Sequence, residues 1–401
     1  MRVILFTGKG GVGKTTSAAA TAALAARAGH RTLVLSTDPA HSLGDALDLP
    51  LGPAPVRIAE RLDAVQFDAL HRFEQSWSDV RGYLVSLLRR GGLDEVAAEE
   101  VVVPPGVEEV LALLEVRALA ATGRWDVLVV DCAPTAETLR LLALPAALRW
   151  YVDRLVPSHR RLAGALRPLL GRELGELLPD DAVVGAASRL AEALGDVQDL
   201  LGDASTTSVR LVLTPEAVVL AETRRTFTTL ALYGFAVDGV VVNRVIPDGD
   251  DPWRAGWAAA QAEQLVEARR SFAGVPIRTV PYLPVEPRGI AALGALGDEL
   301  YAGDDPVAGA PAEPPMTIRT TDGARILSLA LPLAATADVD LARVGDDLVV
   351  TVGGHRRVLA LPEALRRAVV AGAGLENGRL DVRFVLPDPV DTPVPAAGGG
   401  R

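Results

Sequence analysis

The residues nearest the amino terminus that could carry out chemistry form a glycine-rich loop. Gly8-Lys-Gly-Gly-Val-Gly-Lys14-Thr15 fits the pattern G-x-x-x-x-G-K-T and lies between an apolar run and an Ala-rich helical pattern. Glycines let backbone amides point at phosphate oxygens, and the following helix amino terminus favours negative charge. We predict that ATP binds here, with Lys14 on the β- and γ-phosphates and Thr15 on Mg²⁺. The predicted nucleotide-binding residues of the loop are Lys9, Gly10, Gly11, Val12, Gly13, Lys14, Thr15 and Thr16.

A second lysine, Lys9, stands at the start of this loop. Because Lys14 already serves one triphosphate, we hypothesise that Lys9 reaches a nucleotide held by a second protomer, as an arginine finger supplied in trans does. The alternative is a solvated loop lysine without a role. The hypothesis predicts a homodimer in which Lys9 and Lys14 both act in catalysis.

Two aspartates follow predicted strands: Asp38 follows 32–37, and Asp131 follows 127–130. In an open α/β sheet, ligands bind beyond the carboxyl ends of the strands. We predict that Asp131 holds Mg²⁺ through a water molecule. Asp38 precedes Pro39, which keeps the chain extended, and we expect its carboxylate to position and activate the attacking water. The alternatives are a turn residue for Asp38 and a structural hydrogen-bond acceptor for Asp131.

The elements that must position these residues alternate between strands and helices. An Ala-rich helix is predicted from Thr15 to Ala28, ended by Gly29. Several strands are apolar throughout, as expected for parallel strands covered on both faces. The sequence therefore predicts a doubly wound, mostly parallel α/β sheet. The predicted strands are 3–7, 32–36, 127–130, 210–214, 239–242 and 278–280.

Two segments interrupt the alternation and are predicted to be helical insertions, at about 67–119 and 141–203. In the second, leucines at 162, 166, 169, 170 and 174 follow the spacing of an amphipathic face. One interpretation is that these helices cover the sheet edge. The other is a helical subdomain with an apolar surface for a partner.

The predicted ATPase domain is 1–301, followed by a Gly-, Ala-, Asp- and Pro-rich linker, 302–315. Beyond it, 316–387 is predicted to be a small all-β sandwich, with hairpin turns at Gly353-Gly354 and Asn377-Gly378. The tail 388–401 is rich in Pro and Gly and is predicted to be disordered. The predicted strands of the β domain are 317–320, 326–331, 347–352, 356–361 and 380–385.

Composition excludes several classes of protein. A net charge of −11 argues against binding of nucleic acid, which needs clustered Lys and Arg. The single cysteine, Cys132, allows no disulfide within the chain and no all-cysteine metal site. The longest uncharged apolar runs are too short for a transmembrane helix. We expect a cytoplasmic protein without a transmembrane segment of its own.

Three motifs in order resemble one family. They are 9–16 (KGGVGKTT), 36–43 (STDPAHSL) and 131–142 (DCAPTAETLRLL). The chain over about residues 1–300 is similar to the arsenical-pump ATPase ArsA and the tail-anchored-protein targeting ATPases, which are deviant-Walker P-loop proteins. The resemblance implies that Lys9 is the intermonomer lysine, Asp38 the switch I catalytic carboxylate and 131–142 the switch II segment.

The resemblance also implies further contacts with the nucleotide. Glu216 lies in a strand-end motif whose Glu is at the nucleotide, Asn243 in a segment whose Asn hydrogen-bonds adenine, and Pro281 in a loop near the base. The segment 105–109 resembles the start of a helix in the client-binding subdomain.

Departures from the family pattern bear on function. In switch II, Cys132 replaces a Thr, and Ala136 and Glu137 replace Gly-His, so switch movement is expected to be tuned differently. The Cys-x-x-Cys pair that binds zinc in targeting factors is absent, and so are the clustered cysteines of the pump. No zinc site and no thiolate arsenite site is therefore expected.

The carboxyl-terminal segments 347–352, 356–362 and 375–384 resemble the β-sandwich of small heat-shock proteins. This domain is interpreted either as a dimerisation or stabilising module or as a chaperone-like domain that shields apolar client segments. The leading functional prediction is a homodimeric Mg²⁺-ATPase that handles an apolar polypeptide or membrane-protein client. The alternatives are the energising subunit of an anion or metalloid pump and a partition-type positioning ATPase.

Overall fold

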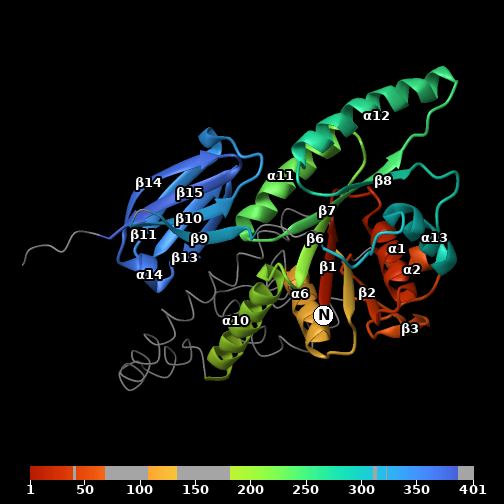
Figure 1. Ribbon diagram of the computed structural model, residues 1–401. Coiled ribbons are helices and arrows are strands. Elements are labelled where there is room, and N and C mark those ends of the chain that lie inside the picture. The colour runs from red at the N-terminus through yellow and green to blue at the C-terminus, as the bar shows by residue number, and fades with distance from the viewer. Residues whose placement is uncertain (39–41, 68–106, 133–180, 310–313, 322, 387–401) are drawn as a thin grey trace, which may run out of the picture. The chain divides into compact units, whose positions relative to one another are not determined.

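A computed structural model describes the chain except for residues 39–41, 68–106, 133–180, 310–313, 322 and 387–401 (Figure 1). The chain divides into two compact units, Met1–Glu313 and Pro314–Arg401. The predicted leucine stripe, most of switch II including Ala136 and Glu137, and the segment 105–106 lie outside the described residues.

The first unit is built on an eight-stranded sheet of order β3-β4-β2-β5-β1-β6-β7-β8. All neighbouring strands are parallel except β3 and β4, which are antiparallel. This mostly parallel α/β sheet confirms the predicted fold class. The strands are β1 (Arg2–Thr7), β2 (Thr32–Ser36), β3 (Val56–Ala59), β4 (Leu62–Gln66), β5 (Val127–Asp131), β6 (Thr207–Leu213), β7 (Val237–Val245) and β8 (Ile277–Pro281).

Helices lie on both faces of this sheet (Figure 1). From β1 the chain moves outward through β2 to β4, then returns through β5 to the other side of β1. Because crossovers between parallel strands are right-handed as a rule, helices of the two directions are expected on opposite faces. α1, α2 and α13 contact one another on one face. The helices are α1 (Lys14–Arg27), α2 (Ser42–Leu47), α6 (Val107–Ala121), α10 (Asp181–Gly202), α11 (Ala217–Tyr233), α12 (Pro252–Ser271) and α13 (Gly289–Tyr301).

Strands β2, β4, β5 and β6 are buried at every residue, which is the expected result of covering both faces of a parallel sheet. The structure adds β3 and β4, which the sequence did not predict. Two polar residues interrupt the apolar run of β4, and both are buried: Asp63 accepts a hydrogen bond from Trp125 Nε1 at 2.9 Å, and Gln66 ends the strand. Because these polar residues break the apolar pattern, the sequence did not indicate strand β4.

Helix α1 packs closely against α13 through small residues. A side chain at Gly297 would place its Cβ 2.8 Å from the carbonyl oxygen of Ala20, so only glycine permits this approach. Seven alanines of α1 are buried. The hydroxyls of Thr21 and Tyr301 hydrogen-bond across the contact at 2.7 Å. The helix that follows the glycine-rich loop is thus fixed along its length.

A buried ionic cluster lies at the amino ends of the strands. Asp238 accepts from Arg2 Nη2 at 3.0 Å on one oxygen and from Arg210 Nε at 3.2 Å on the other. Arg2 Nη2 also donates to Ser208 Oγ at 2.7 Å. Both oxygens of this carboxylate therefore have guanidinium partners.

Arg210 also holds the chain that leaves α13. Its Nη1 donates to Tyr301 Oη at 2.6 Å and to the carbonyl of Pro306 at 2.8 Å, and its Nη2 reaches the carbonyl of Ala308 at 3.5 Å. The first part of the predicted linker is thus bound to the first unit.

The second unit consists of two antiparallel sheets of order β14-β15-β10-β9 and β11-β12-β13, as the predicted all-β class requires. β11 and β14 were not predicted, and two glycines in β14 weaken its strand signal. Within the described residues, no helix is long and apolar enough to cross a membrane. The elements are β9 (Met316–Thr321), β10 (Ala324–Ala330), η1 (Thr336–Asp338), β11 (Val339–Val344), β12 (Asp347–Val352), β13 (His355–Ala360), α14 (Glu363–Arg366), β14 (Val369–Glu376) and β15 (Arg379–Val385).

Candidate functional site

The glycine-rich loop lies between β1 and α1, as its motif requires, and neighbouring strands brace it. A Cβ at Gly8 would lie 2.1 Å from the carbonyl oxygen of Val212 in β6, and one at Gly13 would lie 2.2 Å from Asn243 Nδ2. Gly13 also has φ of 97°, in the left-handed region that favours glycine. These two glycines allow β6 and β7 to hold the loop from behind. Val12 is buried, Thr15 and Thr16 are partly exposed, and Gly10 and Gly11 are exposed.

Asn243, predicted to contact adenine, donates from Nδ2 to the carbonyl of Val12 at 2.8 Å. Its Oδ1 accepts from the backbone amide of Arg244 at 2.9 Å. In this structure the side chain fixes the phosphate loop to the carboxyl end of β7, and its adenine contact stays a prediction.

The two lysines of the loop have different surroundings. Lys14 is buried, and its Nζ donates to the backbone carbonyl of Lys9 at 3.2 Å, so the ammonium lies across the loop itself. The side chain of Lys9 is 40% exposed, and its Nζ lies 3.4 Å from Glu222 Oε2 in α11. An exposed pair of this kind contributes about 0–1 kcal/mol, so Lys9 is readily released from it. Lys14 therefore contacts its own loop, whereas Lys9 lies at the surface.

Asp131 is the last residue of β5 and is completely buried. Its Oδ2 accepts hydrogen bonds from Thr15 Oγ1 at 2.7 Å and from Ser36 Oγ at 3.1 Å. The hydroxyls of Thr15 and Ser42 lie 3.0 Å apart. Four oxygen-bearing side chains from α1, α2, β2 and β5 therefore meet at the carboxyl ends of the strands.

The second oxygen of this carboxylate, Asp131 Oδ1, is buried and has no hydrogen-bond partner among the residues that the structure describes. Burial raises the pKa of Asp131 to about 6, although the hydrogen bond from Thr15 and the charge of Lys14 act in the opposite direction. An unpaired, desolvated carboxylate oxygen beside two hydroxyls is a donor set that suits Mg²⁺, which takes oxygen ligands. The residues present therefore fit the predicted ion.

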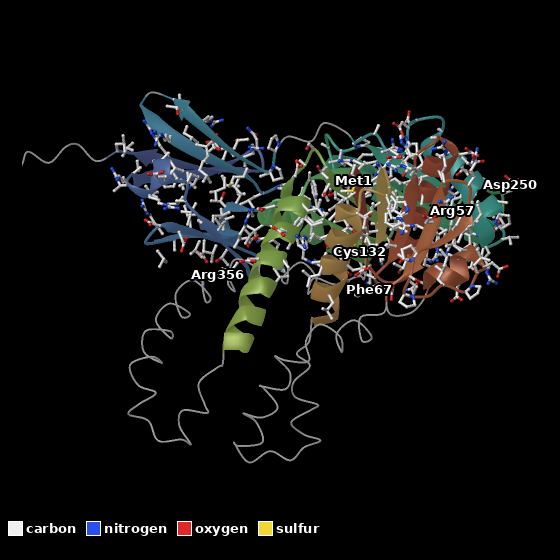
Figure 2. All side chains as sticks on the ribbon, turned by 90° about the horizontal axis from the view of Figure 1, so that it is seen from below. Met1, Arg57, Phe67, Cys132, Asp250 and Arg356 are labelled. Carbon is white, nitrogen blue, oxygen red and sulfur yellow. The ribbon has the colours of Figure 1, made fainter. Side chains whose placement is uncertain are left out.

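Cys132, labelled in Figure 2, follows Asp131. Burial raises the pKa of its thiol to about 12, and the Asp131 carboxylate adds to the increase. A thiol in this state is a poor soft-metal ligand at neutral pH, because the ligand is the thiolate.

Asp38 lies two residues beyond β2, and its backbone is held on both sides. Its amide donates to Ser36 Oγ at 3.2 Å, and its carbonyl accepts from Gln66 Nε2 at 2.9 Å. Thr37, which lies between Ser36 and Asp38 in the chain, donates its amide to the carbonyl of Asp131 at 3.0 Å. These contacts connect the Asp38 segment to Asp131.

The remaining predicted residues lie at the same end of the sheet but farther along it. Glu216 is the N-cap residue of α11 and is exposed, without a side-chain capping bond. Pro281 ends β8, and the amide of Tyr282 beside it donates to the carbonyl of Val245 at 2.8 Å. Their contacts with nucleotide stay predictions.

Four residues of this region were not singled out from the sequence: Ser36, Ser42, Gln66 and Glu222. Ser36 and Ser42 flank Asp38 within the second motif, so their hydroxyls were available as a signal. Gln66 is a polar residue at the end of an apolar run, which is a weaker signal. Nothing in the sequence near Glu222 indicates that it pairs with Lys9.

Within the part of the chain that the structure describes, no group of three or more His, Cys, Asp and Glu side chains is arranged to hold a metal. The site therefore differs from a cage of acidic or soft ligands. Its one buried carboxylate would leave most positions around Mg²⁺ to phosphate and water.

Comparison with known proteins supplies the remaining evidence. The family described as anion-transporting ATPase matches residues 1–302, and an HSP20-like domain found in ArsA matches residues 322–384. A protein of Prosthecochloris vibrioformis named "Putative arsenical pump-driving ATPase" is 35% identical over 382 residues, which cover 94% of this chain and 93% of the relative. An uncharacterized protein of Streptomyces coelicolor is 40% identical over 392 residues, covering 97% of this chain and 98% of the relative.

Proposed function

The chain belongs to the anion-transporting ATPase family, and we propose that it works as a homodimeric, Mg²⁺-dependent ATPase that handles an apolar protein client. Membership makes it an ATP hydrolase. The observation that carries the proposal is the buried Asp131 carboxylate, whose unpaired oxygen lies beside Thr15 at the phosphate loop. A cytoplasmic location is part of the proposal, since a single cysteine suits a reducing compartment.

In the proposed mechanism, the amides of the phosphate loop and the Lys14 ammonium bind the phosphates and neutralise their negative charge. Mg²⁺ would be held by Thr15 and by Asp131 through a water, and when bound it supplies further charge neutralisation. Asp38 orients the attacking water and accepts its proton. Lys9 leaves Glu222 and reaches the phosphates held by the partner protomer.

The different surroundings of the two lysines support the proposed homodimer. Lys14 already lies across its own loop, whereas Lys9 is half-exposed and held only by a weak surface pair. A lysine so placed is available to a second copy of the chain at little energetic cost.

Mixing two inactive variants tests this arrangement. Lys9→Ala keeps a complete phosphate loop but lacks the trans lysine, and Lys14→Ala keeps Lys9 but cannot hold phosphate. If Lys9 acts in trans, an equal mixture should regain about a quarter of wild-type activity, since half the dimers are mixed and each has one complete site. Glu222→Gln, which changes only the resting partner of Lys9, is the control and should hydrolyse ATP normally. No regain of activity in the mixture would refute the trans role.

The client part of the proposal rests on the HSP20-like match over residues 322–384, since the resemblance to small heat-shock proteins implies a domain that shields apolar segments. The chain would use ATP-driven closure of the first unit to grip or release such a segment. Asp38→Asn, held with ATP and Mg²⁺, should co-purify with membrane proteins or apolar-tailed polypeptides beyond the level of Lys14→Ala. Equal recovery from both variants would argue against a client of this class.

A second candidate function is suggested by the relative named as an arsenical pump-driving ATPase. The chain offers one thiol, that of Cys132, whose pKa is raised to about 12. An energising pump subunit of this kind would need soft ligands other than a thiolate cluster. Stimulation of ATP hydrolysis by arsenite would favour this function, and its absence would favour the protein client.

A further inference from the structure

The backbone of Asp38 is held by two side chains that belong to different strands. Ser36 is the last residue of β2, and Gln66 is the last residue of β4, the strand paired with it in parallel at this position. Both are buried, at 0% and 2% exposure. Ser36 binds the amide of Asp38 and Gln66 binds its carbonyl, at 3.2 Å and 2.9 Å.

These contacts hold a residue where no regular structure does. β2 ends at Ser36 and α2 begins at Ser42, so Asp38 belongs to neither element. The position of a catalytic carboxylate matters, because a displacement of about 1 Å can lower a rate about 100-fold. The two buried strand ends hold the backbone of Asp38 at this point.

Ser36 does more than hold an amide. Its hydroxyl accepts from the Asp38 amide while donating to Asp131 Oδ2 at 3.1 Å. One hydroxyl thus joins the residue that we assign to water with the residue that we assign to Mg²⁺. Hydrogen bonds in such a chain support one another, so the two assignments share one geometry.

The contacts of Gln66 within the described part of the chain point to one role for its side-chain amide. Its Nε2 donates to the carbonyl of Asp38, and its Oε1 is buried with no hydrogen-bond partner among the described residues. Leaving a buried acceptor unpaired is destabilising, and an apolar residue of the same size would avoid this cost. A glutamine at this position is therefore better explained by its contact with Asp38 than by stability of the sheet.

We propose that Gln66 and Ser36 are positioning residues that hold the backbone of Asp38 for ATP hydrolysis. This inference rests on the proposed catalytic role of Asp38. Gln66 is assigned no contact with nucleotide or with the Mg²⁺ residues, so its loss should act on the rate of the chemical step and leave nucleotide binding intact.

The test measures kcat, KM for ATP and ADP affinity of the full-length chain with Mg²⁺. Gln66→Met conserves volume but removes the donor, and we expect kcat to fall about 10- to 100-fold with KM and ADP affinity within about twofold of wild type. Ser36→Ala should also lower kcat, and because it removes a hydrogen bond to Asp131 it should weaken Mg²⁺-dependent nucleotide binding as well. Thr32→Val alters a buried threonine at the opposite end of β2 and should leave kcat unchanged.

A double variant separates this inference from the assignment on which it rests. Asp38→Asn alone should lower kcat about 10²- to 10⁴-fold, the usual range for loss of a general base. If Gln66 acts only through Asp38, adding Gln66→Met to Asp38→Asn should cause no further loss. A normal rate in Asp38→Asn would refute the proposed role of Asp38. A normal kcat in Gln66→Met, with Asp38→Asn inactive, would refute only the positioning role.

A structural effect would give a different pattern. If Gln66→Met lowered kcat and also weakened ADP binding, or lowered kcat equally in the Asp38→Asn background, Gln66 would be supporting the whole site. Either result would overturn the positioning role of Gln66. Thermal unfolding of each variant, which should lie close to that of wild type, detects general loss of structure.

Discussion

Two buried aspartates stand at opposite ends of the same sheet and have opposite surroundings. Asp238, at the amino ends of the strands, is 3% exposed and has guanidinium partners on both oxygens. Asp131, at the carboxyl ends, is 0% exposed, and within the described residues one of its oxygens has no hydrogen-bond partner. The charge of the first aspartate is balanced by two guanidinium groups, whereas the second has an oxygen available to the proposed Mg²⁺. Burial alone therefore does not distinguish the two carboxylates, but the partners of their oxygens do.

The largest effect expected from this comparison is on Asp238. Asp238→Asn would leave the buried Arg210 and the partly buried Arg2 without a counter-charge, and we expect it to lower the free energy of unfolding by about 3–5 kcal/mol. Urea unfolding at pH 7.5 measures this change. Asp298→Asn, which removes the exposed partner of Arg27, should lower it by less than about 1 kcal/mol. Similar losses in the two variants would show that the cluster is not a stabilising ion pair.

The next effect concerns Asp131 and has a defined pH dependence. Burial in the folded state raises the pKa of its carboxyl from the ordinary value of 3.8, which applies to the unfolded chain, to about 6. Between these values the unfolded state releases its proton first, so the contribution of this group to the free energy of unfolding falls as pH rises. Asp131→Asn removes that fall. The free energy of unfolding of the variant, taken relative to that of wild type, should therefore rise by about 2 kcal/mol from pH 4.5 to pH 7.5.

Urea unfolding of both proteins at the two pH values measures this gain without nucleotide or Mg²⁺. Any change in the free energy of unfolding that the new buried amide causes does not depend on pH. That change cancels when the difference between the two proteins at one pH is subtracted from the difference at the other. If the difference between the two proteins did not change with pH, the carboxyl would not have a raised pKa.

The smallest effect is the stabilisation by Mg²⁺. With ADP present, Mg²⁺ at about ten times its Kd should raise the free energy of unfolding of wild type by about 1.4 kcal/mol. Asp131→Asn should lose most of this gain. Asp126→Asn alters a surface carboxylate paired with Arg31 just before β5, and it should keep the gain. An equal gain in all three proteins would place the ion elsewhere.

Much of this architecture could be predicted from local patterns. Apolar runs that end in Ser36 and Asp131 identified central strands, and the loop motif located the phosphate site between β1 and α1. The roles of the site residues remain predictions. What could not be predicted depends on contacts between distant segments: the pairing of Lys9 with Glu222, and that of Gln66 with the Asp38 backbone. Such contacts are set by the packing of neighbouring strands and helices, and no single segment encodes them.

The close contact between α1 and α13 bears on the kinetics of nucleotide capture. Phosphate is expected to bind at the amino terminus of a helix that Gly297 and the bond between Thr21 and Tyr301 already hold in place. Little conformational entropy then remains to be lost when nucleotide arrives, so the rate of capture should be governed by diffusion and charge rather than by slow ordering of the helix. Gly297, which lies in the neighbouring helix and outside the phosphate loop, is thereby expected to influence the rate at which nucleotide binds.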